Sequence, residues 1–561
     1  MNQHSFPILL LAGALSSSSL CGQTPTVMPG WPIEVFGNSV GGGALVNVDL
    51  DPELELIQIC GSASSSSQVH VFNPDGTYVP GWPVTVGLGT FAPPAFGDID
   101  GDGDGEIVLT EFYFGLSGSL WALHHDGNLV SGFPFSYGGP LKGPSLGDLD
   151  GDGDLEIVVG FNSGGIGSLF AIQGDGSVMP GWPQNFSTVL GSSASIADVD
   201  LDGVVEIFAP SYELLYGFRP DGSSLPGFPF DPGNQYFNYN TASLADLDHD
   251  GDREIVFATS DHFVDRPGKV WALHHDGSSV AGWPKSTQYS VFAPPSVADI
   301  DGDGNPDIAV GDQLLSPTPV NSIYAWDAGG SPLPGFPVTP VDALLSQIII
   351  ADVNGDQQLE LLYESNVNGD DYHAVRHDGS PVAGWPLPVD GSSFNQALSA
   401  ADVDGDGFLN LAGTGDIVST GKTKIYLWAT TSPWVDTLAP VPTPMYVPTR
   451  SGQALDSNLK LSLSGGCPGP TTATISGASP FGKVHLLYSS GVGNIVIPPP
   501  FPCSGLELGL SNLGLSRAAT LIADSQGSAS MFGVTPSGAC GNVWLQAVDE
   551  DSCTASNVVG L

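Results

Sequence analysis

The stretch FGDIDGDGDGEIVLT, residues 96–110, decides the fold of this chain, because variants of it recur along most of the sequence. Each variant joins an apolar start to alternating acidic residues and glycines, and then to a second apolar run. The variants are LVNVDLDPELELIQI (45–59), LGDLDGDGDLEIVVG (146–160), IADVDLDGVVEIFAP (196–210), LADLDHDGDREIVFA (244–258), VADIDGDGNPDIAVG (297–311), IADVNGDQQLELLYE (350–364) and AADVDGDGFLNLAGT (400–414). Their acidic loops start 48 to 53 residues apart, a period that indicates a repeat architecture.

A second mark, Gly-Trp-Pro or Gly-Phe-Pro, keeps the same period. It occurs at 30–32, 81–83, 132–134, 181–183, 227–229, 282–284, 335–337 and 384–386. Most copies follow an Asp-Gly turn such as HHDG (124–127), which is a strong hairpin signal. Each unit therefore reads as four short strands, the fourth of which is expected to carry the Gly-Trp-Pro.

Four strands in about fifty residues make one blade of a β-propeller. We therefore predict an all-β chain with an eight-bladed propeller, or a seven-bladed one if one repeat stands outside the ring. The first Gly-Trp-Pro precedes the first acidic loop, and the last unit has IYLWA (425–429) with no such mark after it. Residues 30–36 are therefore expected to complete the final blade and close the ring, which removes an open sheet edge.

The net charge of the chain indicates which classes of partner it is unsuited to bind. The chain has 561 residues and a formal charge of −47, from 60 Asp and Glu against 13 Lys and Arg, although only 13% of its residues are charged. Its 41% hydrophobic content, with 26 Phe, 14 Tyr and 11 Trp, argues against an acidic disordered protein. Nucleic acid and anionic membrane surfaces are disfavoured as partners, because binding them requires clustered basic side chains.

The acidic loops suit a metal ion. Counting Asp98 as position 1, carboxylates stand at positions 1, 3, 5 and 9 with glycine at 6, so that a tight turn directs several oxygens at one centre. Ca²⁺ accepts six to eight oxygen ligands in irregular geometry, whereas Mg²⁺ demands an octahedron and soft transition metals favour His or Cys.

The eight loops are unequal as candidate calcium sites, and we expect about five strong sites and up to eight in all. The strong set comprises Asp98, Asp100, Asp102 and Glu106; Asp148, Asp150, Asp152 and Glu156; Asp198, Asp200, Asp202 and Glu206; Asp246, Asp248, Asp250 and Glu254; and Asp299, Asp301, Asp303 and Asp307. The weaker set comprises Asn47, Asp49, Asp51 and Glu55; Asp352, Asn354, Asp356 and Glu360; and Asp402, Asp404 and Asp406, whose loop ends in the neutral Asn410.

These loops and their period resemble FG-GAP/VCBS repeats, the calcium-binding propeller repeats of integrin α-subunits and of many secreted bacterial proteins. The resemblance covers about residues 28–435. It implies that positions 1, 3, 5 and 9 supply side-chain ligands and position 7 a backbone carbonyl. Such repeats specify fold and calcium well but function poorly, since they occur in adhesion proteins, lectin-like proteins and some enzymes.

The two ends of the chain differ from the repeats. Residues 1–23 read as a signal peptide for secretion, with a short apolar run but no basic residue before it. Residues 436–452 are a Pro-rich linker or final wrap, and residues 453–561 are expected to form a small β-sandwich. Two disulfides are expected there among Cys467, Cys503, Cys540 and Cys553, in any of three pairings. Cys60 reads as a buried strand thiol.

No motif indicates catalysis. The GxSxG matches at 37–41 and 143–147 lack the strand–turn–helix context that this motif requires. The pairs His124-His125 and His274-His275 occupy one hairpin position in two repeats and are expected to be solvent-facing strand ends. Three segments break the repeat and gather aromatic residues with Asn or Asp, namely 111–118, 230–240 and 363–373.

The sequence thus favours a secreted calcium-binding β-propeller that acts in cell adhesion or binding, with a glycan or a cell-surface protein as partner. The alternative is a propeller-type polysaccharide lyase or another carbohydrate-active enzyme. No stretch after the signal-like run reaches transmembrane length, and the oligomeric state is left open.

Overall fold

The structure is a computed structural model whose described residues form strands, turns and loops without an α-helix. It describes 24–435 except 40, 50, 52, 63–64, 89–91, 112–117, 138–141, 262–264 and 366–370, then 438–443 and 445. Beyond these it describes 460–465, 469–476, 483–489, 492–496, 507–510, 516–522, 529–535, 543–549, 554–555 and 559–560. Within these ranges no helix has the length and apolarity needed to cross a membrane. The expected signal segment and all four C-terminal cysteines lie outside the described residues.

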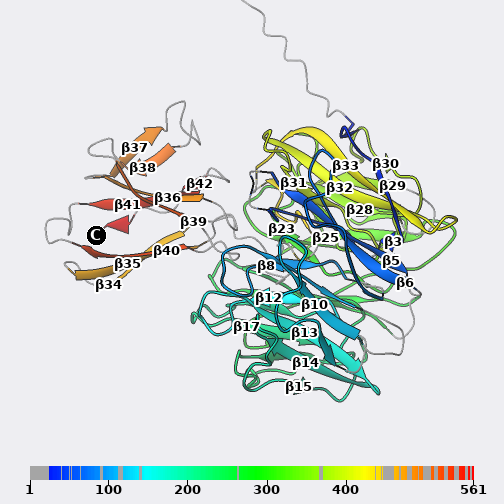
Figure 1. Ribbon diagram of the computed structural model, residues 1–561, viewed down its shortest axis with the longest axis horizontal. Coiled ribbons are helices and arrows are strands. Elements are labelled where there is room, and N and C mark those ends of the chain that lie inside the picture. Colours follow the sequence, from blue (N-terminus) through cyan, green and yellow to red (C-terminus); the bar gives the residue numbers. More distant parts are fainter. Residues whose placement is uncertain are drawn as a thin grey trace, which may run out of the picture.

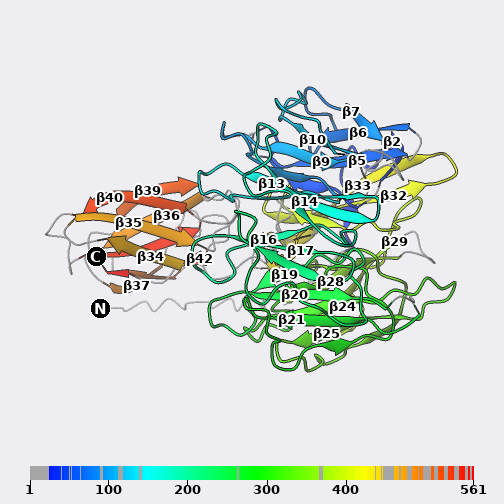
Figure 2. The same ribbon diagram turned by 90° about the horizontal axis from the view of Figure 1, so that it is seen from below.

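Eight small antiparallel sheets occupy the described residues between 26 and 433, and we number them by the order of their acidic loops (Figures 1 and 2). Sheets 1 to 4 are β3 (Asn38–Ser39), β4 (Ala44–Val46), β5 (Glu55–Ser62), β6 (Ser65–Phe72) and β7 (Val84–Leu88); β8 (Ala95–Gly97), β9 (Glu106–Thr110), β10 (Gly118–Leu123) and β11 (Phe135–Tyr137); β12 (Ser145–Gly147), β13 (Glu156–Ser163), β14 (Ile166–Ile172) and β15 (Gln184–Asn185); and β16 (Ser195–Ala197), β17 (Glu206–Pro210) and β18 (Leu215–Phe218). Sheets 5 to 8 are β19 (Ser243–Ala245), β20 (Glu254–Thr259), β21 (Lys269–Leu273) and β22 (Lys285–Ser286); β23 (Ser296–Ala298), β24 (Asp307–Gly311), β25 (Asn321–Asp327) and β26 (Val338–Val341); β27 (Ile349–Ala351), β28 (Glu360–Glu364), β29 (Asp371–Arg376) and β30 (Leu387–Pro388); and β31 (Ser399–Ala401), β32 (Phe408–Ile417) and β33 (Lys422–Pro433) with β1 (Thr26–Val27) and β2 (Ile33–Phe36).

A three-residue strand begins each repeat and lies beside the equivalent strand of the next sheet, as β8 does beside β12 and β12 beside β16. A serine in this strand often donates its hydroxyl to a carbonyl of the following repeat. The bonds are Ser145 to Ala194 (2.8 Å), Ser195 to Ala242 (2.6 Å), Ser243 to Pro295 (2.6 Å), Ser296 to Ile348 (2.6 Å) and Ser399 to Gly43 (2.8 Å). The last bond joins sheet 8 to sheet 1, so the sheets form a closed ring, which is the arrangement of a β-propeller.

The ring closes as the sequence predicts. Strand β2 pairs antiparallel with β33, with Ile33 opposite Ile425 and Phe36 opposite Lys422. Strand β1 pairs with the same strand further along, with Val27 opposite Trp428. The final sheet therefore takes strands from both ends of the repeat region, and the backbone groups of β33 find partners there.

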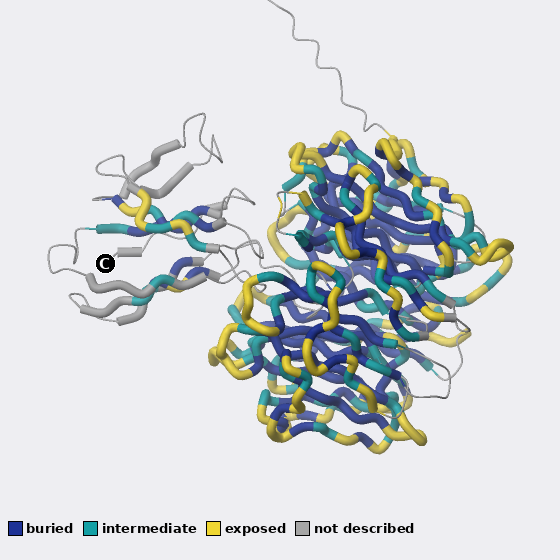
Figure 3. The backbone as a smooth tube through the Cα atoms, in the orientation of Figure 1, coloured by how far each residue is buried: buried dark blue, intermediate teal, exposed yellow. Residues whose placement is uncertain are grey.

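The apolar side chains do not form one central core. They form separate clusters, each of which fills the space between neighbouring sheets. Val108 and Leu120 of sheet 2 pack with Leu146 and Ile157 of sheet 3, and similar clusters join each sheet to the next around the ring. Figure 3 shows buried strands in the interior and exposed loops at the rims. Cys60 is among the buried side chains, as expected, and burial raises the pKa of its thiol.

The Gly-Trp-Pro mark differs from expectation. It lies in a turn, and the fourth strand begins only after the proline, as β7 does after Pro83. The indole of Trp82 in sheet 1 donates to the carbonyl of His125 in sheet 2 (2.9 Å), and Trp31, Trp182 and Trp283 make the same link one sheet onward. Gly81 has φ +101° and lies so close to the Asp126 carbonyl that a Cβ would approach it to 2.1 Å. The mark therefore fastens neighbouring sheets together, and its glycine is required by close backbone approach.

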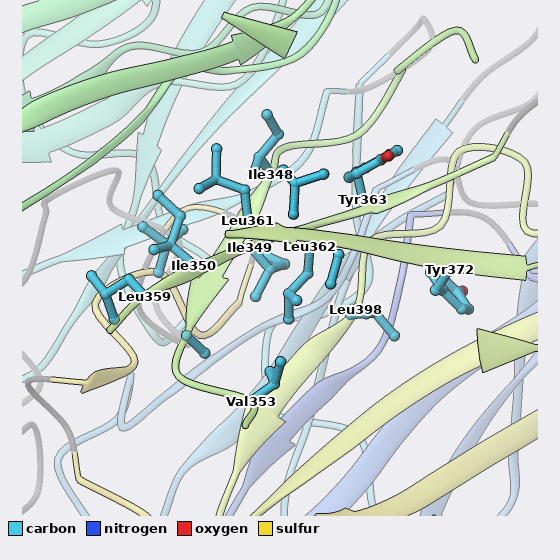
Figure 4. Packing of buried hydrophobic residues seen from close by; sticks show 14 of the residues in the cluster. Ile348, Ile349, Ile350, Val353, Leu359, Leu361, Leu362, Tyr363, Tyr372 and Leu398 are labelled. Carbon is cyan, nitrogen blue, oxygen red and sulfur yellow. The ribbon is translucent and has the colours of Figure 1, made fainter. Parts of the chain in front are cut away.

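The stretch after β33 is not a free linker where it is described. Val441 exchanges backbone hydrogen bonds with Ile350 of β27 (3.1 and 3.3 Å), and Pro442 accepts one from the amide of Ala400 in β31 (2.8 Å). Ala439 and Val441 are buried in the cluster formed by sheets 6 to 8, part of which is seen in Figure 4 around Ile349 and Leu361. The described part of this segment inserts between the first strands of sheets 7 and 8.

The C-terminal strands gather apart from the ring in Figure 1. They are β34 (Lys460–Gly465), β35 (Gly469–Ser476) and β40 (Ala529–Thr535); β36 (Lys483–Ser489), β39 (Ser516–Ile522), β41 (Trp544–Asp549), β42 (Thr554–Ala555) and β43 (Val559–Gly560); and β37 (Val492–Val496) with β38 (Glu507–Leu510). Leu461 and Ile475 of the first sheet share a core with Val484, Leu486 and Ala547 of the second. These strands therefore have a hydrophobic core of their own.

Candidate metal centres

All eight acidic loops share one backbone frame. In the second loop, the carboxylate of Glu106 at position 9 accepts a hydrogen bond from the amide of Ile99 at position 2 (3.0 Å). The same bond joins Glu55 to Val48, Glu156 to Leu149, Glu206 to Val199, Glu254 to Leu247, Asp307 to Ile300, Glu360 to Val353 and Asn410 to Val403, at 2.6 to 3.0 Å. Even the neutral Asn410 keeps this bond, so the frame is a property of the fold and does not depend on the charge at position 9.

Position 6 needs the left-handed conformation that glycine adopts without strain. Gly103 has φ +94°, and its amide donates to the carboxylate of Asp98 at position 1 (3.0 Å). In the seventh loop Gln357 takes the same conformation, with φ +67°, and its amide donates to Asp352 (2.8 Å). The loop turns tightly around the position-1 carboxylate in both cases, although a non-glycine residue pays a strain cost there.

Oxygen atoms converge inside the turn. One oxygen from each of Asp98, Asp100 and Glu106 lies within 4.8 Å of the other two, and the same holds for Asp49, Asp51 and Glu55. Two oxygens bound to one Ca²⁺ at about 2.3–2.6 Å are at most about 5 Å apart, so this spacing fits a shared calcium ion.

Buried oxygens without a hydrogen-bond partner point to the same conclusion. They include Asn47 Oδ1, Glu55 Oε1, Asp198 Oδ1, Asp246 Oδ1, Asp299 Oδ1 and Asp404 Oδ1. A buried polar atom without a partner is costly, and an ion is one way to supply the missing contact. The donor set in these loops, all oxygen and mostly anionic, therefore fits a hard divalent cation.

Burial makes the position-9 carboxyls reluctant to ionise in the metal-free protein. Desolvation, opposed by the amide bond and reinforced by neighbouring aspartates, raises the pKa of Glu106 to about 8 and that of Glu156 to about 7. The pKa values of Glu55, Glu206 and Glu254 are raised to about 7, and those of Asp307 and Glu360 to about 8, with desolvation as the largest cause in each. A bound cation would favour the charged form and reverse this effect.

These shifts predict how the stability of the metal-depleted protein depends on pH. Well below about pH 4 these carboxyls are protonated in both the folded and the unfolded chain, and they impose no cost. As pH rises to about 8 the unfolded chain loses their protons first, so the folded state becomes progressively less stable. We expect a higher melting temperature at pH 5 than at pH 8 in metal-free buffer. The buried His70, whose pKa desolvation lowers to about 4, acts in the opposite sense but is a single group.

A melting series from pH 5 to pH 8 on dialysed, metal-depleted protein checks this expectation. Glu106→Gln and Glu156→Gln should each flatten the dependence, because they remove one titrating carboxyl. A melting temperature that rises steadily toward pH 8 would contradict the assignment of these carboxyls as the destabilising groups.

The hairpin beside each of the first seven loops contributes a further residue, which the sequence alone did not place next to the loop. We call it the turn residue: it is the residue whose amide donates to the carbonyl four positions later, at the start of the turn between the third strand and the Gly-Trp-Pro or Gly-Phe-Pro mark. In sheets 1 to 7 it is Asn73, His124, Gln173, Arg219, His274, Asp327 and Arg376. Strand register places it across from position 9, as in the direct pair of Glu360 with Arg376. That the turn residue lies beside position 9 follows only from the pairing of the second strand with the third, as β28 pairs with β29.

The turn residue changes the charge of its loop. Arg219 lies 3.3 Å from Asp202 and 3.9 Å from Glu206, and Arg376 lies 2.7 Å from Asp356. A guanidinium thus offsets some of the negative charge of the fourth and seventh loops. His124 and His274 directly follow the ends of β10 and β21 and are partly exposed, as expected of strand ends, but their imidazoles also contact Glu106 and Glu254.

Aromatic residues of the segment 230–240 gather at the opposite end of the sheets. The rings of Tyr212 and Tyr236 stack with centroids 4.9 Å apart. The ring of Tyr239 is two-thirds exposed, with the ammonium of Lys142 5.1 Å from its centroid. Tyr239 has φ +59°, a conformation that is uncommon for a residue other than glycine and that often marks a functional position.

The remaining candidates from the sequence are the two GxSxG matches and the two other aromatic segments. Ser145 of the second GxSxG match is fully buried and donates its hydroxyl to the carbonyl of Ala194 (2.8 Å). Residue 40 of the first match lies outside the described residues. Residues Tyr363, Asp371 and His373 of the segment 363–373 line a hollow of about 290 Å³, and segment 111–118 is described only at its two ends.

Comparison with known proteins gives a family match and several similar folds. Residues 148–209 and 246–310 match the family described as FG-GAP-like repeat. The biofilm matrix protein Bap1 of V. cholerae is similar over 75% of this chain and 96% of its own, with 14% identity and a TM-score of 0.50. The C-terminal domain of Pseudomonas aeruginosa PilY1 is similar over 66% of this chain and 92% of its own, with 12% identity and a TM-score of 0.37. The curated proteins contain no match.

Proposed function

This chain carries FG-GAP-like repeats in a propeller fold, and from that premise we propose that it is an exported binding or adhesion module stabilised by calcium. We infer eight blades, because eight sheets and their shared clusters run around the ring and strands from both ends of the repeat region complete the last of them. Export is supported by the signal-like residues 5–20 and by four cysteines in the last hundred residues.

Calcium in this proposal is structural. The carboxylates at positions 1, 3, 5 and 9 would hold the ion, which would neutralise buried acids and tie the two strands of each loop together. We expect the third and sixth loops to contribute most, because they keep all four carboxylates and have neither an arginine nor a histidine as turn residue. The fourth and seventh loops contribute less, because Arg219 and Arg376 already supply positive charge there.

The binding surface is proposed at the end of the sheets away from the acidic loops. In an antiparallel blade the first strand runs into the acidic loop, so the segment before that strand and the loop between the second and third strands lie at the other end. Tyr236 and Tyr239 precede β19, and Tyr212 follows β17, so all three belong to this end. The amides of Tyr212 and Tyr239 donate to the carbonyls of Val189 and Gly191, which places the two residues next to one stretch of chain.

A carbohydrate is the ligand that this cluster supports best, and the cluster is the observation that carries the proposal. An exposed aromatic ring stacks on the apolar face of a sugar, while nearby polar groups bind its hydroxyls. Tyr239 offers such a ring, held outward by a strained backbone, and Lys142 adds a positive charge beside it. The ammonium favours a sugar that bears a carboxylate, in a chain whose net charge otherwise repels one.

The experiment is a glycan array with neutral and acidic polysaccharides, run beside a turnover assay on the acidic ones. We expect binding without turnover, and an affinity about tenfold lower for Tyr239→Ala, which corresponds to about 1.4 kcal/mol. Tyr488→Ala, which removes an exposed tyrosine of the C-terminal strands, is the matched control and should bind like the unaltered chain. Unsaturated products would overturn the binding role in favour of a lyase, and equal binding by Tyr239→Ala would remove the tyrosine cluster from the proposal.

A further inference from the structure

Two of the eight acidic loops face an imidazole. In sheet 2 the Nδ1 atom of His124 lies 3.1 Å from Glu106 Oε1, and in sheet 5 that of His274 lies 3.0 Å from Glu254 Oε1. Both glutamates are fully buried, and both histidines are only about a quarter to a third exposed. The arrangement recurs 150 residues apart with nearly the same distance, so it is a repeated feature of the fold.

Each imidazole lies close to loop aspartates as well as to the position-9 glutamate. Nδ1 or Nε2 of His124 lies within 4.8 Å of carboxylate oxygens of Asp104 and Glu106, and also within that distance of Asp100 and Asp102 oxygens. His274 forms the equivalent group with Asp248 and Glu254. Each histidine is followed by another, His125 and His275, whose Nδ1 contacts the position-7 aspartate, so the hairpin carries two imidazoles toward one loop.

A nitrogen donor changes which cation such a loop prefers. Oxygen-only sites suit Ca²⁺ and Mg²⁺, whereas imidazole suits zinc and other divalent transition metals. Two ligands on one Zn²⁺ at about 2.0–2.1 Å lie about 3.3 Å apart in a tetrahedron, close to the His-to-Glu spacing in both sheets. A neutral histidine with its proton on Nε2 offers the Nδ1 lone pair to the ion, which then takes the place of the hydrogen between Nδ1 and the carboxylate.

We propose that the loops of sheets 2 and 5 are zinc-class sites, in which His124 and His274 bind the ion together with the position-9 glutamate and loop aspartates. The remaining loops keep oxygen-only sets and stay selective for Ca²⁺. This inference rests on the proposed function insofar as it places a metal ion in the acidic loops, and it adds that the turn residue selects which ion.

The third acidic loop serves as an internal control for the second. The third loop, LGDLDGDGDLEIVVG, has the same acids at positions 1, 3, 5, 7 and 9 as the second, but its turn residue is Gln173. The amide of Gln173 donates to the carbonyl of Ser177, as the amide of His124 does to that of Asn128, so the two residues are equivalent in the fold. Glu156 keeps its bond to Leu149 (2.7 Å), so the frame around the ion is also the same. At this position His124 offers a ring nitrogen with a free lone pair, whereas the amide nitrogen of Gln173 has none to give to a metal ion.

The test uses the full chain, stripped with EDTA, dialysed and titrated with Zn²⁺ in millimolar Ca²⁺ against a chromogenic zinc chelator. We expect two zinc ions per chain to bind despite the calcium. His124→Gln should lose one, the double variant His124→Gln/His274→Gln should lose both, and each lost site should bind at least about tenfold more weakly. Gln173→His should gain a third. His485→Gln, a change in the C-terminal strands, is the control for zinc bound at surface histidines.

Cobalt gives a second readout that a merely structural histidine would not move. Co²⁺ in place of zinc should show the visible absorption of a low-coordinate nitrogen and oxygen site in the unaltered chain and in Gln173→His, and lose it in the double variant. Zinc binding that is the same in the double variant and in the unaltered chain would overturn the inference and leave each histidine as an ion-pair partner of its glutamate.

The calcium-induced rise in melting temperature separates this inference from the proposed function. If zinc binding depends on the histidines while calcium has no effect on the melt, the calcium proposal fails alone. If calcium raises the melting temperatures of the unaltered chain and of the double variant equally, and both bind zinc equally well, only the zinc inference fails.

Discussion

Excess EGTA is expected to lower the melting temperature of this protein by more than about 10 °C, and added Ca²⁺ to restore it. An ion that binds only the folded chain stabilises it by about 2.7 kcal/mol per site when its free concentration is a hundred times its Kd. Several loops with converging oxygens multiply that contribution, while the metal-free state retains clustered carboxylates around buried groups such as Glu106. A kilocalorie per mole shifts the melting temperature of a domain of this size by roughly 1–3 °C.

Differential scanning calorimetry with and without chelator, beside elemental analysis of the purified protein, measures this effect. Glu156→Gln should reduce the calcium-induced shift by about one site's share, because it removes a ligand while leaving the backbone frame in place. Asp231→Asn changes net charge equally at an exposed aspartate outside the loops and should leave the shift unchanged. An unchanged melt in excess EGTA, with no calcium in the purified protein, would sink the calcium proposal.

Val441→Asp is expected to destabilise the ring by more than about 4 kcal/mol. Val441 is fully buried, and its backbone pairs with Ile350 between the first strands of sheets 7 and 8. A carboxylate there would be placed among apolar side chains without a cation to pair with, and burying an unpaired charge is one of the few changes with so large a cost. The segment also separates two sheets, so its displacement would expose the cluster that those sheets share.

Urea unfolding followed by tryptophan fluorescence measures the loss, since Trp428 lies in the same cluster. Thr431→Asp adds the same charge at an exposed position of β33 and should cost no more than about 0.5 kcal/mol. Equal midpoints for the two variants would show that the segment after β33 does not hold the ring together.

Local pattern predicted most of the fold. The alternation of acids with glycine marked each tight loop, because only a few residue types tolerate the left-handed backbone at position 6, and the order of the marks predicted that residues 30–36 close the ring. The local sequence pattern did not predict features that depend on contacts between residues far apart in the chain. The Gly-Trp-Pro lies in a turn because its indole bonds to the next sheet, and segment 438–443 packs between two sheets because its apolar side chains find space there. Neither partner lies near in sequence.

The site divides in the same way. The sequence by itself determined which residues could serve as ligands and that their loops repeat, since positions 1 to 9 are close along the chain and steric rules limit how such a turn closes. Only the tertiary structure decided what faces these loops: a guanidinium in sheets 4 and 7, and an imidazole in sheets 2 and 5. The physical reason is strand register. Pairing of the second strand with the third brings residues about twenty positions apart into contact, and one residue of slip would turn them to opposite faces.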